Sequence, residues 1–477
     1  MSSTTMPAAS AETAVQEQPL IPACDGWPRL LDGTALLGRF AGSGLREPPY
    51  LIRRRDGQIV QLSKLLYTIA SCMDGRGLAA SAAAATERLD LRVTPDLIAH
   101  VAEQKLAPLG LVAHADGTEP RLERLNPLLA LRFRAGIMPA RAVNGIAGVL
   151  RVLFWPPLMM VTLAALLACD VWLATSHGIS AGVQTIIHSP TLGLALFGLL
   201  ILSMAFHEFG HATASRYGGA RPGRIGVGIY LVFPAFYTDV TESYQLGRGG
   251  RLRTDLGGVY FNALVALAAA GAYFATGYEP LLVVTVTQQA LLIDQFVPWL
   301  RLDGYHIISD LIGVSDLFAR IKPVVLSLVP GRPLDRRVAE LKPWARAAVS
   351  IWVITTVVVL TGAVVMIVVS APGYLRQAWQ SLILQLQGIG FGAHTGNVTE
   401  VATGVVGAFM LILPVAGMIL TYLMLCRQIG ASLARRTTRV DLTLASRGNA
   451  PTVSGAAPDP HGPRRDAVRI RCASLSR

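Results

Sequence analysis

Six long apolar stretches limit what this 477-residue chain can fold into. Each approaches the roughly 20 residues that a helix needs to cross the hydrocarbon core of a bilayer. They lie at about 149–173, 190–212, 255–276, 281–301, 347–371 and 403–426. A shorter apolar stretch at 225–236 contains Pro234, and we expect a re-entrant or interfacial hairpin there. The sequence therefore predicts a polytopic α-helical membrane protein with about six spans and one such hairpin.

The composition excludes several other classes of protein. Apolar residues make up 52% and charged residues 15% of the chain, against about 45–50% and about 25% in soluble domains. This apolar content is incompatible with a disordered chain. The net charge of +12 is not accompanied by the polar surface of a nucleic-acid-binding protein. The five cysteines are scattered without a CxxC pair, which argues against a disulfide framework and a cysteine zinc site.

Lysine and arginine residues are concentrated on one side of the predicted spans. They precede the first span, separate the second from the third and the fourth from the fifth, and follow the sixth. The loops at 175–189 and 277–280 carry none, and the loop at 372–402 carries only Arg376. Because positively charged loops stay in the cytoplasm, we predict a multi-pass plasma-membrane protein whose N- and C-termini are both cytoplasmic.

A small folded cytoplasmic domain is predicted before the first span. Asp56-Gly57 lies between two strand-like segments and predicts a two-residue hairpin. Ser63 and Thr94 can each cap a helix, and an alanine-rich helix is expected between them. With a closing strand expected at 109–112, the plan is a winged-helix-like α+β domain.

This domain resembles the peptide-chaperone domain of pyrroloquinoline-quinone biosynthesis, also called the precursor-peptide recognition element. The resemblance rests on the segments 50–75 and 93–112. It implies a module that holds a peptide by pairing it to a sheet edge. A structural cap and a DNA-binding winged helix are the alternatives. The predicted segments are 1–45 (disordered), 46–118 (winged-helix-like), 119–147 (basic juxtamembrane linker), 148–427 (membrane domain) and 428–477 (disordered basic tail).

The second span carries residues with the spacing of a metal site. His207 and His211 are four residues apart, so both imidazoles project from one face of a helix. Such a pair can bind zinc, and Glu208 beside it can take a proton from a zinc-activated water. Ionisable residues inside a span are costly and mark a functional site by default. A pair of helix-contact histidines with a structural carboxylate is the alternative.

Two histidines leave a zinc ion incompletely coordinated, and Asp303 is the best candidate for a third ligand. It follows the fourth span, at the end that the charge pattern places on the cytoplasmic side. The histidine end of the second span lies on the same side, so both half-sites are expected at one depth. Gly304 would let the backbone approach closely beside this ligand. A solvated loop carboxylate is the alternative.

At this point the chain resembles the site-2 protease class of intramembrane zinc metalloproteases, in the bacterial branch often called peptide zinc metalloproteases. The resemblance rests on His207-Glu208-Phe209-Gly210-His211-Ala212 and Leu302-Asp303-Gly304-Tyr305, with similar segments at 230–240 and 257–262. It implies that His207, His211 and Asp303 bind one zinc ion and that Glu208 is the catalytic acid and base. It also suggests that Asn262 stabilises the oxyanion, with an interhelical hydrogen bond as the alternative.

Two positions depart from that family, and two further carboxylates have no assigned role. Val297 stands where an asparagine is usual, which puts a polar substrate contact there in doubt. His306 stands where an aromatic residue is usual and could add a metal ligand, although an exposed or hydrogen-bonded histidine is expected. Asp239 could contact substrate from the hairpin. Asp294, within the fourth span, is expected to face the helix bundle.

The sequence thus favours a membrane-embedded zinc endopeptidase that cuts a peptide bond near the cytoplasmic face. The expected partners are a precursor-peptide or membrane-protein substrate, the lipid bilayer, and an exporter or modifying enzyme encoded nearby, with no nucleic acid. One alternative is regulated intramembrane proteolysis of a membrane-tethered regulator. Another is a non-catalytic transporter or immunity protein with a vestigial zinc site.

Overall fold

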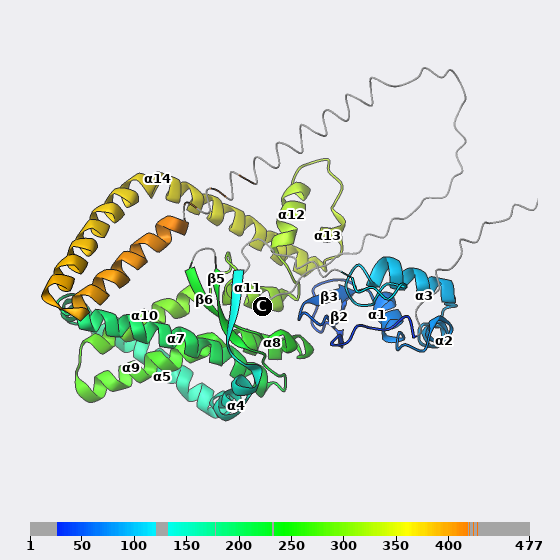
Figure 1. Ribbon diagram of the computed structural model, residues 1–477, viewed down its shortest axis with the longest axis horizontal. Coiled ribbons are helices and arrows are strands. Elements are labelled where there is room, and N and C mark those ends of the chain that lie inside the picture. Colours follow the sequence, from blue (N-terminus) through cyan, green and yellow to red (C-terminus); the bar gives the residue numbers. More distant parts are fainter. Residues whose placement is uncertain are drawn as a thin grey trace, which may run out of the picture. The chain divides into compact units, whose positions relative to one another are not determined.

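A computed structural model describes residues 26–120, 132–176, 178–230 and 233–417, together with 419, 423 and 427. Figure 1 traces its helices and strands along the chain. The contacts divide the chain into two compact units. The first contains the described residues up to Leu36 with Ile52–Asp56 and Leu62–Arg124, and the second contains Leu37–Leu51, Gly57–Gln61 and the residues from Leu125 onward.

Three short strands and three helices follow one another in the N-terminal region. β1 (Ala35–Arg39), β2 (Tyr50–Arg53) and β3 (Ile59–Leu62) form a sheet in that order. They are followed by α1 (Lys64–Ser71), α2 (Leu78–Leu89), α3 (Pro95–Val101) and a π-helical turn, η1 (Ala102–Leu106). The Ser63 side chain accepts a hydrogen bond from Leu66 N, and Thr94 accepts one from Leu97 N. The predicted caps and alanine-rich helix are therefore confirmed. β2 and β3 are neighbours as the predicted hairpin requires, but five residues, 54–58, connect them instead of two.

Two predictions for this region are wrong. Residues 109–112 form no strand, and Val112 instead makes an isolated bridge with Leu30. Residues 26–45, expected to be disordered, contain β1 and the buried side chain of Phe40. A short strand depends on a distant pairing partner, so its own composition is a weak signal. Residues 1–25 and 428–477 lie outside the described residues, and the disorder expected there stays a prediction.

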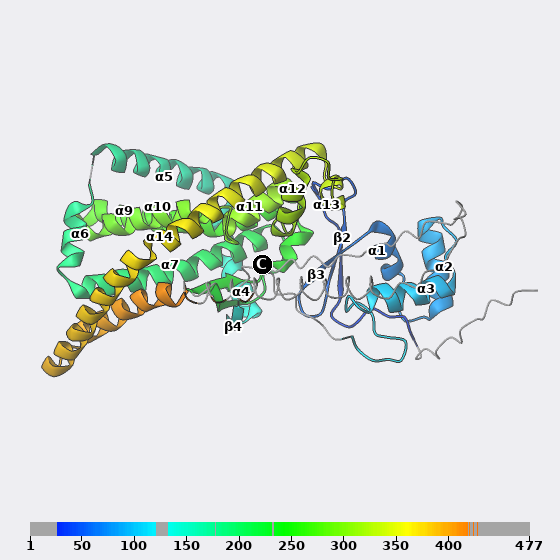
Figure 2. The same ribbon diagram turned by 90° about the horizontal axis from the view of Figure 1, so that it is seen from above.

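Long apolar helices form a bundle in the second unit (Figure 2). Among the described residues, five are long and apolar enough to cross a membrane: α5 (Pro156–Ser176), α7 (Pro190–Tyr217), α9 (Gly257–Thr276), α14 (Pro343–Thr395) and the helix at Val398–Gly417. The fourth predicted span coincides with α10 (Pro280–Gln295), which packs against α9 but has only 16 residues. The described chain therefore contains five helices of membrane-crossing length where the sequence predicted about six spans.

α14 corrects the loop predicted at 372–402. The helix runs for 53 residues, passes through Pro372 and ends at a C-cap, Gly396, with a φ of 71°. A proline removes one backbone hydrogen bond, and the leucine, alanine and glutamine residues that follow Pro372 favour a helix. Gly396 ends it because glycine readily adopts the left-handed conformation of a helix C-terminus.

The apolar stretch at 225–236 lies in two strands of a second sheet. β5 (Ile225–Tyr230) and β6 (Phe233–Thr238) are antiparallel, with Ile225 opposite Thr238. β4 (Arg132–Met138) pairs with the other side of β5, and α4 (Ala140–Leu150) and η2 (Arg151–Phe154) follow it. The predicted hairpin forms, while its re-entrant or interfacial position stays a prediction. Part of the predicted linker is a strand and a helix. In the strand order β4-β5-β6, β6 is an edge.

Short helices connect these elements. They are α6 (Ser180–Ile187), η3 (Thr241–Gln245), α8 (Arg248–Asp255), α11 (Asp303–Ile312), η4 (Phe318–Arg320), α12 (Ile321–Ser327) and α13 (Arg336–Ala339). α8 leads directly into α9, and α11 packs against α8. The end of α7, the start of α9 and the start of α11 carry the candidate site.

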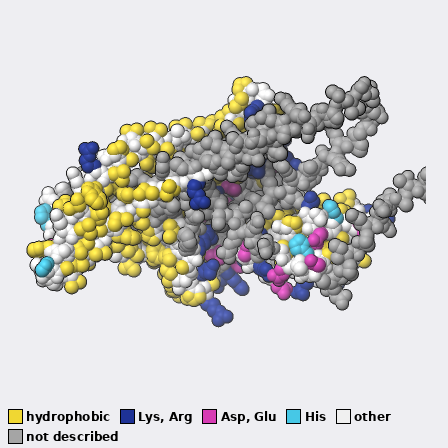
Figure 3. All heavy atoms as spheres, turned by 45° about the horizontal axis from the view of Figure 1, so that its top comes forward, with side chains coloured by type: hydrophobic (Ala, Val, Ile, Leu, Met, Phe, Trp, Pro, Cys, Tyr) yellow, Lys and Arg dark blue, Asp and Glu magenta, His cyan; other side chains and the backbone are white. Residues whose placement is uncertain are grey.

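The long helices present apolar side chains on their outer surface. Figure 3 shows hydrophobic side chains over much of this part of the molecule. On α14, for example, Val364, Met366 and Val369 are all more than half exposed. Monomeric soluble proteins rarely expose so large a continuous apolar surface. The surface is therefore compatible with a membrane protein.

Candidate metal centre

Two histidines lie one helical turn apart near the end of α7. The Nε2 atoms of His207 and His211 are 3.1 Å apart, and both side chains are buried. Their spacing of four residues places both rings on one face of the helix. Gly258 on α9 makes room for the first ring, because a Cβ at this position would lie 2.3 Å from His207 Nε2. The site therefore depends on a close approach of α7 and α9.

Asp303, the first residue of α11, reaches the same point from a distant part of the chain. Its Oδ2 atom lies 3.1 Å from His207 Nε2 and 3.2 Å from His211 Nε2. Gly304 lies against the end of α10, where a Cβ would come within 2.5 Å of the Phe296 carbonyl group. The structure thus brings together the three residues that the sequence indicated as zinc ligands, with a glycine where the backbone needs it.

The three donor atoms suit a tetrahedral zinc ion. Ligand atoms at about 2.0–2.1 Å from zinc are about 3.3 Å from one another in a tetrahedron. The observed separations of 3.1–3.2 Å are close to that value. His211 Nδ1 donates a hydrogen bond to the Thr254 carbonyl oxygen at 2.8 Å, so in the neutral ring the Nε2 lone pair is free for a metal. The residues present therefore fit a zinc ion.

The surroundings of the Asp303 carboxyl group act on its pKa in opposite directions. Burial raises this pKa, while the positive charge of protonated His211 and His207 lowers it by a larger amount. A bound zinc ion would replace those protons, so the ligand set would be one carboxylate and two neutral imidazoles.

Glu208 lies beside these residues and is held by the second sheet. Ligand atoms of His207, Glu208 and His211 lie within 4.8 Å of one another. Thr238, at the end of β6, places its hydroxyl oxygen 2.7 Å from Glu208 Oε2 and 2.9 Å from the Glu208 carbonyl oxygen. Asp303 thus contacts both imidazoles directly, whereas the Glu208 carboxylate contacts Thr238. Sequence reasoning assigned no role to Thr238.

The site opens into a cavity of about 280 Å³, near the lower limit for ligand pockets. Asn262 is buried in its wall. β6 contributes four consecutive residues, 235–238, and α7 contributes Met204. The lining therefore combines apolar and aromatic side chains with a few polar groups around the candidate ligands.

The other residues noted in the sequence have varied surroundings. His306 lines the cavity, and its ring packs against Tyr305 with 5.2 Å between centroids. Asp239 accepts hydrogen bonds from the backbone N and the hydroxyl of Thr241, which is a local turn contact. Asp294 is exposed on α10, so the expectation that it faces the bundle is wrong. A helix places successive side chains on different faces, and hydropathy alone did not show which face is buried.

Comparisons with known proteins indicate a distant relationship. Over 143 residues, the chain is 24% identical to a protein of Bacillus subtilis (strain 168) named "Putative peptide zinc metalloprotease protein YydH". The match covers 30% of this chain and 56% of that protein, so the chain spans about half the length of the curated relative. No family model and no solved structure matches. The similarity supports a zinc-metalloprotease-like relationship and no closer assignment.

Proposed function

We propose that this chain is a membrane-embedded zinc endopeptidase that hydrolyses a peptide bond near the cytoplasmic face of the bilayer. The observation that carries the proposal is the convergence of His207 Nε2, His211 Nε2 and Asp303 Oδ2 at 3.1–3.2 Å. Glu208 lies within the same group. The distant similarity to YydH and the five helices of membrane-crossing length point in the same direction.

In this proposal His207, His211 and Asp303 hold one zinc ion, and Glu208 is the acid and base. Bound zinc supplies a Lewis acid that lowers the pKa of a water molecule from about 15.7 to about 7. The Glu208 carboxylate takes a proton from the attacking water and delivers it to the leaving amine. The Asn262 amide, in the cavity wall, can donate to the oxyanion that develops on the scissile carbonyl group.

The proposed substrate is an extended segment of a precursor peptide or of a membrane protein. β6 is the edge of its sheet and lines the cavity with residues 235–238. An edge strand can pair with an extended peptide through main-chain hydrogen bonds. A helical substrate must unwind first, because its carbonyl groups are bonded within the helix. The N-terminal region, by its resemblance to peptide-recognition domains, is the proposed recognition module.

Replacement of Glu208 by glutamine tests the enzymatic proposal. The amide keeps the size of the side chain but cannot take a proton from water, so peptide hydrolysis should be lost. Peptide mass spectrometry of cells that express wild-type or Glu208→Gln protein at equal levels would identify the cleavage products. We expect peptides that appear with the wild type and not with the variant, whose zinc content should remain normal. Identical peptide profiles would instead favour a non-catalytic role.

A further inference from the structure

Residues 40–46, here called the strap, come from the N-terminal region but are part of the second unit. Gly44 N donates to the Gly313 carbonyl oxygen at 2.9 Å, and Lys342 N donates to the Gly44 carbonyl oxygen at 2.9 Å. A Cβ at Gly44 would lie 2.4 Å from the Ile312 carbonyl oxygen. The strap is therefore closely fitted between the end of α11 and the residue before α14.

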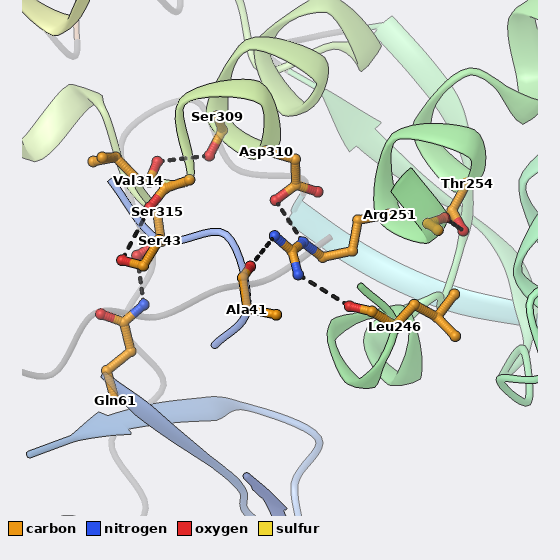
Figure 4. Close-up of polar contacts among 12 residues, drawn as sticks. Ala41, Ser43, Gln61, Leu246, Arg251, Thr254, Ser309, Asp310, Val314 and Ser315 are labelled. Atoms are coloured by element: carbon orange, nitrogen blue, oxygen red, sulfur yellow. Dashed lines mark hydrogen bonds and ion pairs between the residues drawn. The ribbon is translucent and has the colours of Figure 1, made fainter. Parts of the chain in front are cut away.

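The strap also contacts an arginine that is completely buried. Arg251 on α8 has an exposed fraction of 0%. Its guanidinium donates to the Ala41 carbonyl oxygen at 2.8 Å, to the Leu246 carbonyl oxygen at 3.0 Å and to Asp310 Oδ1 at 3.3 Å (Figure 4). The Phe40 ring lies 4.3 Å from Arg251 Cζ. A buried cation needs such partners, because removing one leaves a charge or a polar group uncompensated.

Arg251 connects two short helices, α8 and α11, and each of them contributes to the candidate site. α8 also carries Thr254, whose carbonyl oxygen accepts the hydrogen bond from His211 Nδ1. Asp310 lies on α11, two turns after Asp303. The ion pair between Arg251 and Asp310 therefore fixes the helix that orients one ligand against the helix that provides another.

We propose that Arg251 is a positioning residue for the metal centre and that the strap holds it in place. Ala41 anchors the guanidinium, and the guanidinium keeps α8 and α11 at the spacing that His211 and Asp303 require. The inference rests on the proposed function, since it concerns the same zinc site. In this proposal the strap supports the metal centre, so a change in the strap alters zinc binding.

Zinc affinity of the full-length chain in detergent, measured by competition with a chelator of known affinity, tests this inference. Arg251→Met removes the guanidinium, and Gly44→Ala displaces the strap without changing any charge. Because Arg251 acts on the ligands only through α8 and α11, we expect both variants to lose about tenfold in zinc affinity, the lower end of the 10–100-fold range for loss of a direct contact to a metal ligand. Arg336→Met is the control, as its guanidinium pairs with Glu340 on the surface, and its zinc affinity should be unchanged.

Two milder variants separate a positioning role from a general effect on folding. Arg251→Lys keeps the charge and should recover part of the lost affinity. Asp310→Asn keeps the side-chain shape and should weaken zinc binding even if Arg251→Met does not fold. A lower melting temperature with wild-type zinc affinity in Asp310→Asn and Gly44→Ala would overturn the inference. If the wild-type chain itself binds no zinc, the proposed function fails instead.

Discussion

Two threonines orient the chemical groups of the candidate site through hydrogen bonds. The Thr254 carbonyl oxygen accepts a hydrogen bond from His211 Nδ1, which leaves Nε2 available to a metal. The Thr238 hydroxyl lies within hydrogen-bond distance of the Glu208 carboxylate and fixes its direction. Because each contact acts on a different group, metal binding and turnover should respond to different substitutions.

Removal of the Thr238 hydroxyl should slow turnover without releasing zinc. Thr238→Val keeps the size of the side chain and deletes the hydrogen bond to Glu208 Oε2. A hydrogen bond to a charged group contributes about 1.5–3 kcal/mol, so we expect a kcat roughly 10–100-fold lower. Cleavage kinetics and metal analysis on the same samples would check this, with Thr238→Ser expected to restore the rate. A change in KM alone would contradict a role in holding Glu208.

The sequence predicts which residues come together as metal ligands, but it does not predict the residues that hydrogen-bond to the site. His207 and His211 show their relation directly, since four residues make about one helical turn. Asp303 is grouped with them by a second feature of the sequence. The charged loops predict that Asp303 and the two histidines lie on the same side of the membrane. Thr238 and Thr254 act through a hydroxyl and a backbone carbonyl, and their partners lie 30 and 43 residues away. Hydroxyls and backbone carbonyls occur throughout a protein, so the sequence gives no sign of which one contacts a residue so far away.

Among the helices, α7 and α9 must approach closely for the site to form. A Cβ at Gly210 would lie 2.2 Å from the Gly257 carbonyl oxygen, so neither backbone leaves room for a side chain there. Small residues at such crossings let membrane helices pack backbone to backbone. Gly258, the residue after Gly257, faces the His207 ring. Glycines at this crossing therefore determine the position of a ligand as well as the packing of two helices.

A methyl group at Gly258 should weaken metal binding. In Gly258→Ala the new Cβ would lie 2.3 Å from His207 Nε2 and must displace the ring, so we expect zinc affinity to fall on the order of tenfold or more. Gly271→Ala is the control on the same helix, since no atom lies within 4 Å of its added Cβ. Chelator competition on both variants would measure the difference. Equal affinities would show that α9 does not hold the ring.

The apolar helices were easier to predict than their ends and the short strands. Hydropathy located each apolar stretch, but it did not show that α14 continues through Pro372 or that α10 ends after 16 residues. The sequence predicts a basic linker where β4 forms, because the hydrogen-bond partner of β4, the strand β5, lies about 90 residues later in the chain. β4 therefore depends on a long-range contact, and α14 ends at the C-cap Gly396 rather than at Pro372.

For the molecule as a whole, the orientation in the membrane depends on the short helix α10. Sixteen residues give a helix of about 24 Å, shorter than the roughly 30 Å hydrocarbon core. A short hydrophobic segment can still span if the bilayer thins locally. The proposal that both termini are cytoplasmic requires this crossing, because the other long helices number five among the described residues.

Cysteine labelling would locate the two ends of α10. In a cysteine-free background, we expect Tyr278→Cys, before α10, to react with a membrane-impermeant thiol reagent in intact cells. Leu334→Cys, after α11, should react only once the cells are opened. Both side chains are exposed, at 45% and 47%, so both sites can be reached by the reagent. Labelling of both positions from the same side would show that α10 does not cross.

Metal analysis of the purified full-length chain tests the central claim most directly. We predict one zinc ion per chain in the wild type and its loss in His211→Ala and in Asp303→Ala. His188→Ala is the control, since His188 is exposed and its Nδ1 lies 2.7 Å from the Gln184 carbonyl oxygen one turn earlier in the chain. A wild-type chain without zinc, or full zinc content in both ligand variants, would contradict the account.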